Sequence, residues 1–289
     1  MDFALLRPTS LSEVLEMMNE YPKARLKAGG TDLLVWIKKG LISADHVIDM
    51  GLIPEIKGII PNEGEGIHIG AMATLSDVIC HSAIQKDYPD LTQACRMHSD
   101  PLIRNQATVV GNVCSAVPSG DCIPPLLAHR ALVHTVGSKE PRVMPLEKWI
   151  IAPRTTRILP EEVVSSVFLP QPEEGIRVVG RYLRISRRKA LDLAQVGVCC
   201  VMEWKKSSFQ TYLSYGAVSA VPFRCLEAEQ IINEAQRVDE ELLQFVVDLA
   251  VGSVQPISDV RASQEYRIQM VRELTRQALM ECYLEGRDQ

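Results

Sequence analysis

The sequence has no C-x-x-C pair, no long apolar run and no excess of basic residues, and each absence excludes a class of protein. The scattered cysteines lack the spacing of a zinc or iron–sulfur site. The formal net charge of -5 argues against a general nucleic-acid binder, which normally carries a basic excess. No apolar run is long enough to span a bilayer. The sequence therefore predicts neither a nucleic-acid-binding protein nor a membrane protein.

The N-terminal segment, MDFALLRPTS, lacks the basic and apolar regions of a signal peptide. We therefore expect a cytoplasmic protein whose cysteines are free and mostly buried. These are Cys80, Cys95, Cys114, Cys122, Cys199, Cys200, Cys225 and Cys282. The six histidines, including His98 and His129, show no metal-ligand spacing, and we expect them to be structural.

Signatures of hydrolytic enzymes are also missing. The sequence contains neither G-x-S-x-G nor H-E-x-x-H, and it has no pair of carboxylates at a spacing typical of general acid–base catalysis. Any chemistry is therefore expected to lie in a bound cofactor, for which the protein supplies binding and tuning.

Two short segments rich in Gly and small polar residues are the most informative features that the sequence does contain. They are residues 26–33 (LKAGGTDL) and 103–112 (IRNQATVVGN), and each follows an apolar stretch. Because Gly has no Cβ, backbone N–H groups in such turns can come close to an anion, and consecutive N–H groups bind phosphate oxygens. Two such turns suggest a ligand with two phosphates, although neither fits the usual Rossmann or P-loop pattern.

The chain is long enough for two hydrophobic cores, because 289 residues exceed the usual single-core size. The Pro- and Gly-containing stretch 170–175 is the expected boundary. Before it, strands are expected at 25–28, 46–50, 67–69, 131–136 and 163–169, and helices from Ser10, at 33–38, from Thr74 or Ser76, at 87–98 and at 121–128. After it, strands are expected at 178–185, 196–204 and 211–219, and helices at 226–235, 240–252 and 262–284. Strands followed by helices predict an α+β layout.

In the two Gly-containing segments and in two further motifs, the chain resembles the FAD-binding, or medium, subunit of the molybdenum hydroxylases. This family includes xanthine dehydrogenase and carbon monoxide dehydrogenase. The family's A-G-G-T-D-L corresponds to residues 28–33, and its I-R-N-x-A-T-x-G-G-N to residues 103–112. Its A-S-P-x-S-D segment corresponds to residues 116–121, and its R-R-x-x-D-I-A to residues 187–194. The motifs occur in the family's order and cover nearly the whole chain.

The resemblance implies an α+β fold with two domains. Residues 1–172 would form a two-part FAD-binding domain of the vanillyl-alcohol-oxidase, or PCMH, type, with subdomains of about 1–55 and 56–172. Residues 173–289 would form a smaller α+β domain of antiparallel strands and helices, like the C-terminal domain of the carbon monoxide dehydrogenase flavoprotein.

The resemblance also implies which residues hold the cofactor. The residues of the first motif, which would lie against the pyrophosphate, are Lys27, Ala28, Gly29, Gly30, Thr31, Asp32 and Leu33. The residues on its other side would be Thr108, Val109, Val110, Gly111 and Asn112. Asp121 would face the ribityl or adenosine part, Val164 would pack against the isoalloxazine, and Arg184 would lie near the polar edge of the flavin.

Several of these side chains have a structural alternative. We expect Asp32 to cap the following helix, because a carboxylate beside a phosphate is unfavourable. Asn112 could instead close an Asx turn, and Asp121 could cap the helix that follows it. Val110 replaces a Gly of the family, and since a branched residue resists the left-handed conformation, we expect an extended backbone there or a looser phosphate contact.

The basic run Arg181, Arg184, Arg187, Arg188 and Lys189 is expected to lie partly on a strand, whose alternation would send some members inward. Asp192 is available to pair with one of these arginines. An inward cation near the flavin would stabilise its reduced, anionic form.

The function that the resemblance implies is that of an FAD-binding electron-transfer subunit in a molybdenum-containing hydroxylase or dehydrogenase. A large partner would carry molybdopterin, and a small partner with [2Fe-2S] clusters would deliver electrons. FAD in this chain would pass them to an acceptor such as NAD. Two alternatives remain open: a stand-alone flavin oxidoreductase, and a non-catalytic assembly subunit that has lost FAD.

Overall fold

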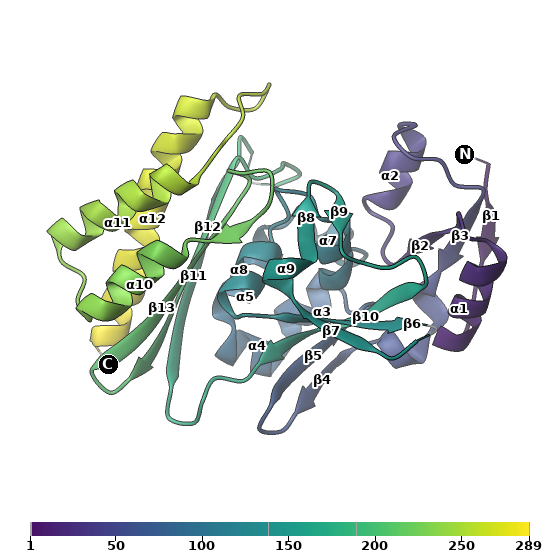
Figure 1. The fold of residues 1–289 in the computed structure, drawn as a ribbon, viewed down its shortest axis with the longest axis horizontal. Helices are drawn as coiled ribbons and strands as arrows, with labels where there is room; N and C mark the ends of the chain where they lie inside the picture. Colours follow the sequence, from purple (N-terminus) through teal and green to yellow (C-terminus); the bar gives the residue numbers. More distant parts are fainter. Residues whose placement is uncertain (1, 138, 189, 289) are drawn as a thin grey trace.

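The computed structural model describes residues 2–137, 139–188 and 190–288, which form two parts with separate hydrophobic cores. In Figure 1 the N-terminal part runs from purple to teal, and the C-terminal part from green to yellow. Among the described residues, no helix is both long and apolar enough to cross a membrane.

The N-terminal part begins with a small parallel sheet in the order β1-β3-β2. Its elements are β1 (Ala4–Leu6), α1 (Leu11–Glu20), β2 (Arg25–Lys27), α2 (Leu33–Lys38) and β3 (His46–Asp49). Helix α1 begins after Ser10, whose hydroxyl accepts the Glu13 N–H at 3.2 Å. The predicted β-α-β unit from 25 to 50 is confirmed, whereas β1 had no clear signal because only three residues form it.

A five-stranded antiparallel sheet in the order β4-β5-β10-β6-β7 forms the rest of this part. The strands are β4 (Ile59–Asn62), β5 (Gly66–Gly70), β6 (Leu132–Gly137), β7 (Arg142–Pro145) and β10 (Glu162–Pro170). A separate pair consists of β8 (Ile150–Ala152) and β9 (Thr155–Thr156). One face of the large sheet packs on the core through Ile69, Val133 and Val167.

Short helices lie between these strands. They are η1 (Met50–Leu52), η2 (Pro54–Ile56), α3 (Leu75–Cys80), α4 (Ser82–Asp87), α5 (Pro89–Met97), α6 (Pro101–Arg104), α7 (Val109–Ser115), α8 (Ile123–Ala128) and α9 (Leu146–Trp149). The helix predicted at 87–98 is confirmed as α5, although it begins at Pro89, and α4, which ends at Asp87, was not predicted. Proline disfavours helical backbone at the residue before it, and Tyr88 accordingly has φ -138°.

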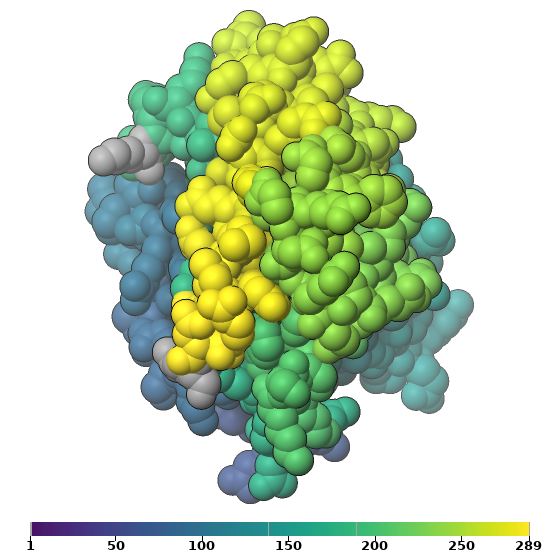
Figure 2. Space-filling model, turned by 90° about the vertical axis from the view of Figure 1, so that its left-hand side faces the viewer, coloured from purple at the N-terminus to yellow at the C-terminus, as the bar shows by residue number. Residues whose placement is uncertain are grey.

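The C-terminal part is an antiparallel sheet in the order β11-β12-β13-β14, with three helices on one face. Its elements are β11 (Arg177–Ile185), β12 (Val196–Lys205), β13 (Ser208–Gly216), β14 (Phe223–Arg224), α10 (Leu226–Ala235), α11 (Glu240–Ser253) and α12 (Gln264–Arg287). Figure 2 shows these helices covering that side of the molecule. The predicted α+β order of strands followed by helices is confirmed.

Strand β12 is buried on both faces because the two parts of the chain pack on opposite sides of it. Val198 and Cys200 face the helix side and belong to the C-terminal core. Cys199 and Val201 face the other way and pack with Ala128 of α8. The C-terminal sheet therefore rests directly on α5 and α8 of the N-terminal part.

Candidate functional site

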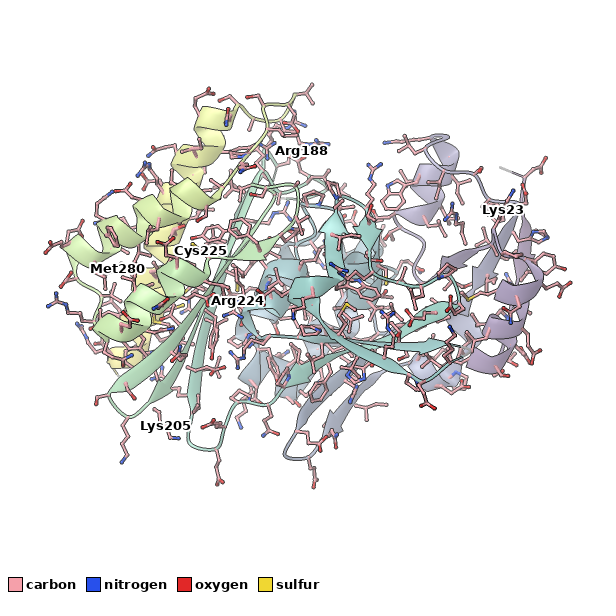
Figure 3. The ribbon with its side chains drawn as sticks, in the orientation of Figure 1. Lys23, Arg188, Lys205, Arg224, Cys225 and Met280 are labelled. Atoms are coloured by element: carbon pink, nitrogen blue, oxygen red, sulfur yellow. The ribbon has the colours of Figure 1, made fainter. Side chains whose placement is uncertain are left out.

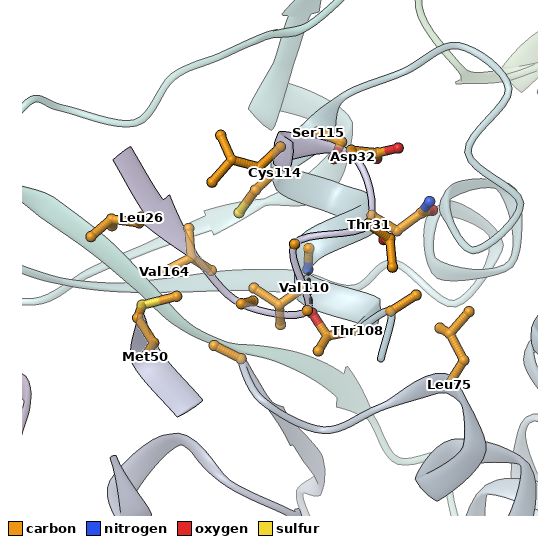
Figure 4. Close-up of a pocket in the computed structure, with 18 of the residues that line it drawn as sticks. Leu26, Thr31, Asp32, Met50, Leu75, Thr108, Val110, Cys114, Ser115 and Val164 are labelled. Carbon is orange, nitrogen blue, oxygen red and sulfur yellow. Dashed lines mark hydrogen bonds between the residues drawn. The ribbon is translucent and has the colours of Figure 1, made fainter. Parts of the chain in front are cut away.

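A cavity in the N-terminal part brings the two Gly-containing segments together. Its lining residues are Leu26, Ala28, Gly29, Gly30, Thr31, Asp32, Leu33, Trp36, Met50, Ala71, Leu75, His98, Ala107, Thr108, Val110, Gly111, Asn112, Cys114, Ser115, Ile158, Val163 and Val164. In Figure 4, Leu26, Met50 and Val164 gather at one side, and Thr31 and Asp32 lie at the other. The cavity therefore has an apolar side and a side formed by polar turns.

The turn after β2 can approach the second segment closely because it begins with glycine. A Cβ atom on Gly29 would lie 1.8 Å from the carbonyl oxygen of Gln106, which is a prohibitive contact with backbone. Gly30 has φ +76°, a conformation that side chains rarely adopt. Both glycines are needed for this turn to lie against the segment that leads into α7.

Backbone donors of both turns are left open. Among the described residues, none accepts a hydrogen bond from the backbone N–H groups of residues 29–33, or from that of Val110. Open N–H groups at successive positions form an anion-binding surface. Because 29–33 and Val110 all line the cavity, an anionic ligand there would satisfy donors that the protein itself does not.

Helix α7 starts at the second segment and decides the conformation of Val110. The Thr108 hydroxyl accepts the Gly111 N–H at 2.9 Å and so caps the helix. Val110 then lies in the first helical turn, with right-handed backbone and a buried side chain. The expectation of an extended backbone at Val110 is wrong, because this position needs a helical residue and not a left-handed one.

Asp32 does not cap α2 through its side chain, so that expectation is also wrong. Its backbone is already helical, with φ -93° and ψ -51°, which turns the carboxylate away from the first N–H groups. The carboxylate instead accepts a hydrogen bond from the Ser115 hydroxyl at 2.6 Å. This contact ties the start of α2 to the end of α7 across the cavity.

Asn112 and Thr108 each have a side-chain donor with no hydrogen-bond partner among the described residues. The Asn112 side-chain oxygen accepts the Cys122 N–H at 3.2 Å, so it does not close an Asx turn. No described residue is hydrogen-bonded to its amide nitrogen, and Asn112 lines the cavity. The hydroxyl hydrogen of Thr108 is likewise free to donate, since its oxygen only accepts in the cap.

Four predicted site residues lie outside the lining. Lys27 Nζ pairs with Asp49 at 3.0 Å and also contacts the Ala28 carbonyl at 3.3 Å. Val109 is fully buried in the core. Asp121 and Arg184 pair with each other at 2.9 Å where the two parts of the chain meet.

Asp121 is the centre of a buried polar cluster. One carboxylate oxygen accepts the Tyr182 hydroxyl at 2.8 Å, and the other lies 2.9 Å from Arg184 Nη1 and 3.2 Å from His98 Nδ1. Burial, followed by the charge of Asp121, raises the pKa of Tyr182, so the phenol remains a donor. Asp121 does not cap the following helix, whose N-cap is Cys122.

The basic run is divided between the two faces of β11, so the expectation that strand alternation sends some members inward is confirmed. Arg184 faces Asp121 of the N-terminal part, and its side chain is 7% exposed. Arg181 faces α12 and pairs there with Glu281 and Glu285. Of these two arginines, Arg184 is therefore the one that faces the N-terminal part, in which the cavity lies.

The rest of the run follows β11. Asp192 Oδ2 lies 3.8 Å from Arg187 Nε and accepts the Arg188 N–H at 3.2 Å, so Asp192 pairs with one of the arginines of the run, as expected. Figure 3 places Arg188 and Lys205 at opposite ends of the C-terminal sheet. Lys189 lies outside the described residues.

The cysteines and His129 show no functional arrangement among the described residues. Six cysteines are buried, and Cys80 and Cys114 are exposed, with no disulfide among the described residues. His129 is buried and pairs with the buried Asp90 at 2.8 Å. No group of three metal-ligating side chains lies together in the part of the chain that the structure describes.

The family described as the FAD-binding domain in molybdopterin dehydrogenase matches residues 1–172. The chain belongs to this family. A second family, the carbon monoxide dehydrogenase flavoprotein C-terminal domain, matches residues 181–282. The two families therefore match the N-terminal and C-terminal parts of the fold, each of which has its own core.

Relatives of similar length support the assignment. The chain is 28% identical over 283 residues to the xanthine dehydrogenase FAD-binding subunit of Escherichia coli O157:H7, covering 97% of this chain and 96% of that one. It is 27% identical to the carbon monoxide dehydrogenase medium chain of Hydrogenophaga pseudoflava, covering 94% of each. A solved structure of carbon monoxide dehydrogenase from that organism superposes with a TM-score of 0.92 at 25% identity, covering 99% of this chain and 98% of that one. Quinoline 2-oxidoreductase from Pseudomonas putida 86 shares the fold, with a TM-score of 0.91 at 21% identity and coverage of 99% of each chain.

Within this family's fold, several lining residues could not be found from the motifs. Cys114 and Ser115 continue α7 beyond Asn112, so the helical repeat could have indicated them. Ile158 comes from a segment distant from either motif, and His98 lies outside both, between the end of α5 and the second motif. Only the folded chain brings them to the cavity.

Proposed function

We propose that this chain is the FAD-binding electron-transfer subunit of a molybdenum-containing hydroxylase or dehydrogenase. The observation that carries the proposal is the pair of turns whose unpaired backbone N–H groups line one cavity. A dinucleotide with a pyrophosphate supplies the acceptors that these groups lack. The apolar side of the same cavity suits a flat aromatic ring system.

The proposed roles of the residues follow from their positions. The first turn, residues 28–33, and the segment from Thr108 to Asn112 would hold the pyrophosphate. Val164 would pack against the ring system. The four predicted residues outside the lining lie close to it. Lys27 and Val109 are next to lining residues in the sequence, and Asp121 and Arg184 are linked to His98 of the lining by hydrogen bonds. Their contact with FAD stays a prediction.

FAD, when bound, allows electrons that arrive singly to leave in pairs. The residues of this chain would bind and orient the cofactor, and the apolar lining would exclude water from its ring system. The buried cation of Arg184 pairs with Asp121, which in turn contacts His98 of the cavity lining.

We further propose the arrangement of the whole assembly. A large molybdopterin-binding partner would act on the substrate, and a small [2Fe-2S] partner would deliver electrons to this chain. The final acceptor would be NAD or another oxidant, and the complex would be cytoplasmic. Residues 1–172 would form the FAD-binding domain, with subdomains of about 1–55 and 56–172, and residues 173–289 the C-terminal domain.

The first test is the visible absorption spectrum of the purified chain, before and after incubation with FAD and desalting. Retained flavin bands are expected. A chain that stays colourless after FAD is added would contradict the proposal and favour the non-catalytic assembly subunit.

A second test addresses the partners. Affinity purification of the tagged chain from its native cells is expected to recover subunits that carry molybdenum and iron–sulfur clusters, detected by metal analysis and absorption. Recovery of a flavin-containing chain alone, active on a substrate of its own, would favour the stand-alone flavin oxidoreductase.

A further inference from the structure

His98 is the only imidazole in the lining of the cavity among the described residues. Its side chain is 21% exposed, and its Nδ1 lies 3.2 Å from the Asp121 carboxylate. No described residue is hydrogen-bonded to its other ring nitrogen, Nε2. One end of the ring is therefore anchored, and the other is available.

The backbone around His98 is held as firmly as its side chain. Helix α5 ends just before it, and Ser99 has φ +49°, which is uncommon for a residue other than glycine. The Arg104 guanidinium donates to the carbonyl oxygens of Arg96, His98 and Ser99, at 2.9, 3.2 and 3.3 Å. This turn is therefore fixed independently of any ligand.

Asp121 fixes the orientation of the His98 imidazole ring. A carboxylate that accepts from Nδ1–H fixes the tautomer and orientation of an imidazole. Asp121 also accepts from Tyr182 at its other oxygen and from Arg184 at the oxygen that contacts His98, and its side chain is 5% exposed. Asp121 is therefore better placed to hold His98 than to contact a ligand itself.

We propose that His98 contacts the bound cofactor through Nε2, and that Asp121 is a positioning residue that acts through His98. The inference rests on the proposed function. Tyr182 and Arg184, which hydrogen-bond to Asp121, belong to β11 of the C-terminal part. The affinity for the cofactor therefore depends on how the C-terminal part packs against the N-terminal part.

The test is a double-mutant cycle on the full chain, with FAD affinity measured by flavin fluorescence titration. His98→Ala is expected to weaken FAD binding about tenfold to a hundredfold, which is the range for one hydrogen bond involving a charged group. Asp121→Asn is expected to weaken it comparably, and the double variant no more than either alone. His98→Gln, whose amide nitrogen can replace Nε2, is expected to recover part of the affinity.

The controls separate this contact from a loss of folding. Tyr182→Phe removes one donor to Asp121 without truncating a ring, and it is expected to weaken binding in the wild type but not in the His98→Ala background. His68→Ala removes an imidazole outside the cavity and is expected to leave both the affinity and the visible spectrum of bound flavin unchanged.

Two results would overturn the inference. If the wild type binds FAD and His98→Ala binds it equally well, His98 does not contact the cofactor, while the proposed function stands. If the effects of His98→Ala and Asp121→Asn add, Asp121 acts independently of His98. A wild type that binds no FAD would overturn the proposed function and this inference together.

Discussion

At the scale of single residues, Gly29 is where the two cavity-forming segments come closest. The contact is between a turn and the backbone of Gln106, so no side-chain rotation can relieve it. The requirement for glycine there is steric and is independent of the cofactor. This separates Gly29 from the open N–H groups, which matter only when a ligand is present.

Gly29→Ala is expected to move the two turns apart and to abolish stable FAD retention. It is also expected to lower the free energy of unfolding by about 1–3 kcal/mol, as other overpacking substitutions do. Flavin absorbance after desalting and denaturant unfolding would measure both effects. Gly252→Ala is the matched control, because its new Cβ has no neighbour within 4 Å and lies within helix α11. Retention of FAD by Gly29→Ala would contradict the close approach.

At the scale of elements, α7 shows how a substitution in a motif is accommodated. The Thr108 cap commits the following residues to a helix, where a β-branched side chain is tolerated. Val110 then contributes its side chain to the N-terminal core. Val110 is therefore a packing residue, and the substitution does not argue against a cofactor.

Val110→Gly is accordingly expected to lower stability and not to improve FAD binding. Loss of a buried branched side chain and of helix propensity should reduce the free energy of unfolding by about 2–4 kcal/mol. Denaturant unfolding and fluorescence titration with FAD would test this. Tighter FAD binding by the glycine variant would show that the valine obstructs the site.

The connection between α11 and α12 carries a second element-scale prediction. Burial opposes ionisation of Asp259, but the N–H groups of Arg261 and Ala262 and the Arg267 guanidinium outweigh it and lower the pKa to about 2. A lowered pKa stabilises the folded chain above the ordinary value of 3.8, and this stability is lost as pH falls toward 2.

Asp259→Asn is therefore expected to lower stability at neutral pH and to reduce the acid-induced loss of stability between about pH 4 and 2. Thermal unfolding across that range would compare the variant with the wild type. Identical pH profiles of the two proteins would contradict the assigned contacts.

At the scale of the whole molecule, the two parts are joined by polar contacts within an otherwise apolar interface. The buried Asp90 of α5 accepts from His129 at 2.8 Å and from the Cys199 thiol of β12 at 3.4 Å. Burial, followed by the charge of Asp90, raises the pKa of Cys199, so it remains a thiol donor. Gly180 of β11 leaves room for this carboxylate, since a Cβ there would lie 2.4 Å from it.

Asp90→Ala is expected to lower the free energy of unfolding by about 1–3 kcal/mol, because it leaves the buried ring nitrogen of His129 without its hydrogen-bond partner. The exposed Asp248, which pairs with Arg272 at the surface, provides the control Asp248→Ala, with a much smaller effect. Denaturant unfolding would compare them. Equal effects of the two substitutions would show that Asp90 does not hold the interface.

The sequence by itself determined the elements that depend on local signals. The Ser10 cap, the strands 178–185 and 196–204, and the helix 226–235 were all predictable, because capping and apolar periodicity are properties of neighbouring residues. The two Gly-containing segments were also recognisable, since glycine at a turn reports a backbone requirement. Elements of two to four residues, such as β14, carry too few side chains to give a pattern.

Only the tertiary structure decided how side chains of those segments are used. Asp32 bonds to Ser115 and not to its own helix, and Asp121 is enclosed by His98, Tyr182 and Arg184. These partners are brought together from distant parts of the chain by the packing of the two cores. Sequence spacing carries no information about such contacts, because a carboxylate binds whichever donors the fold places beside it.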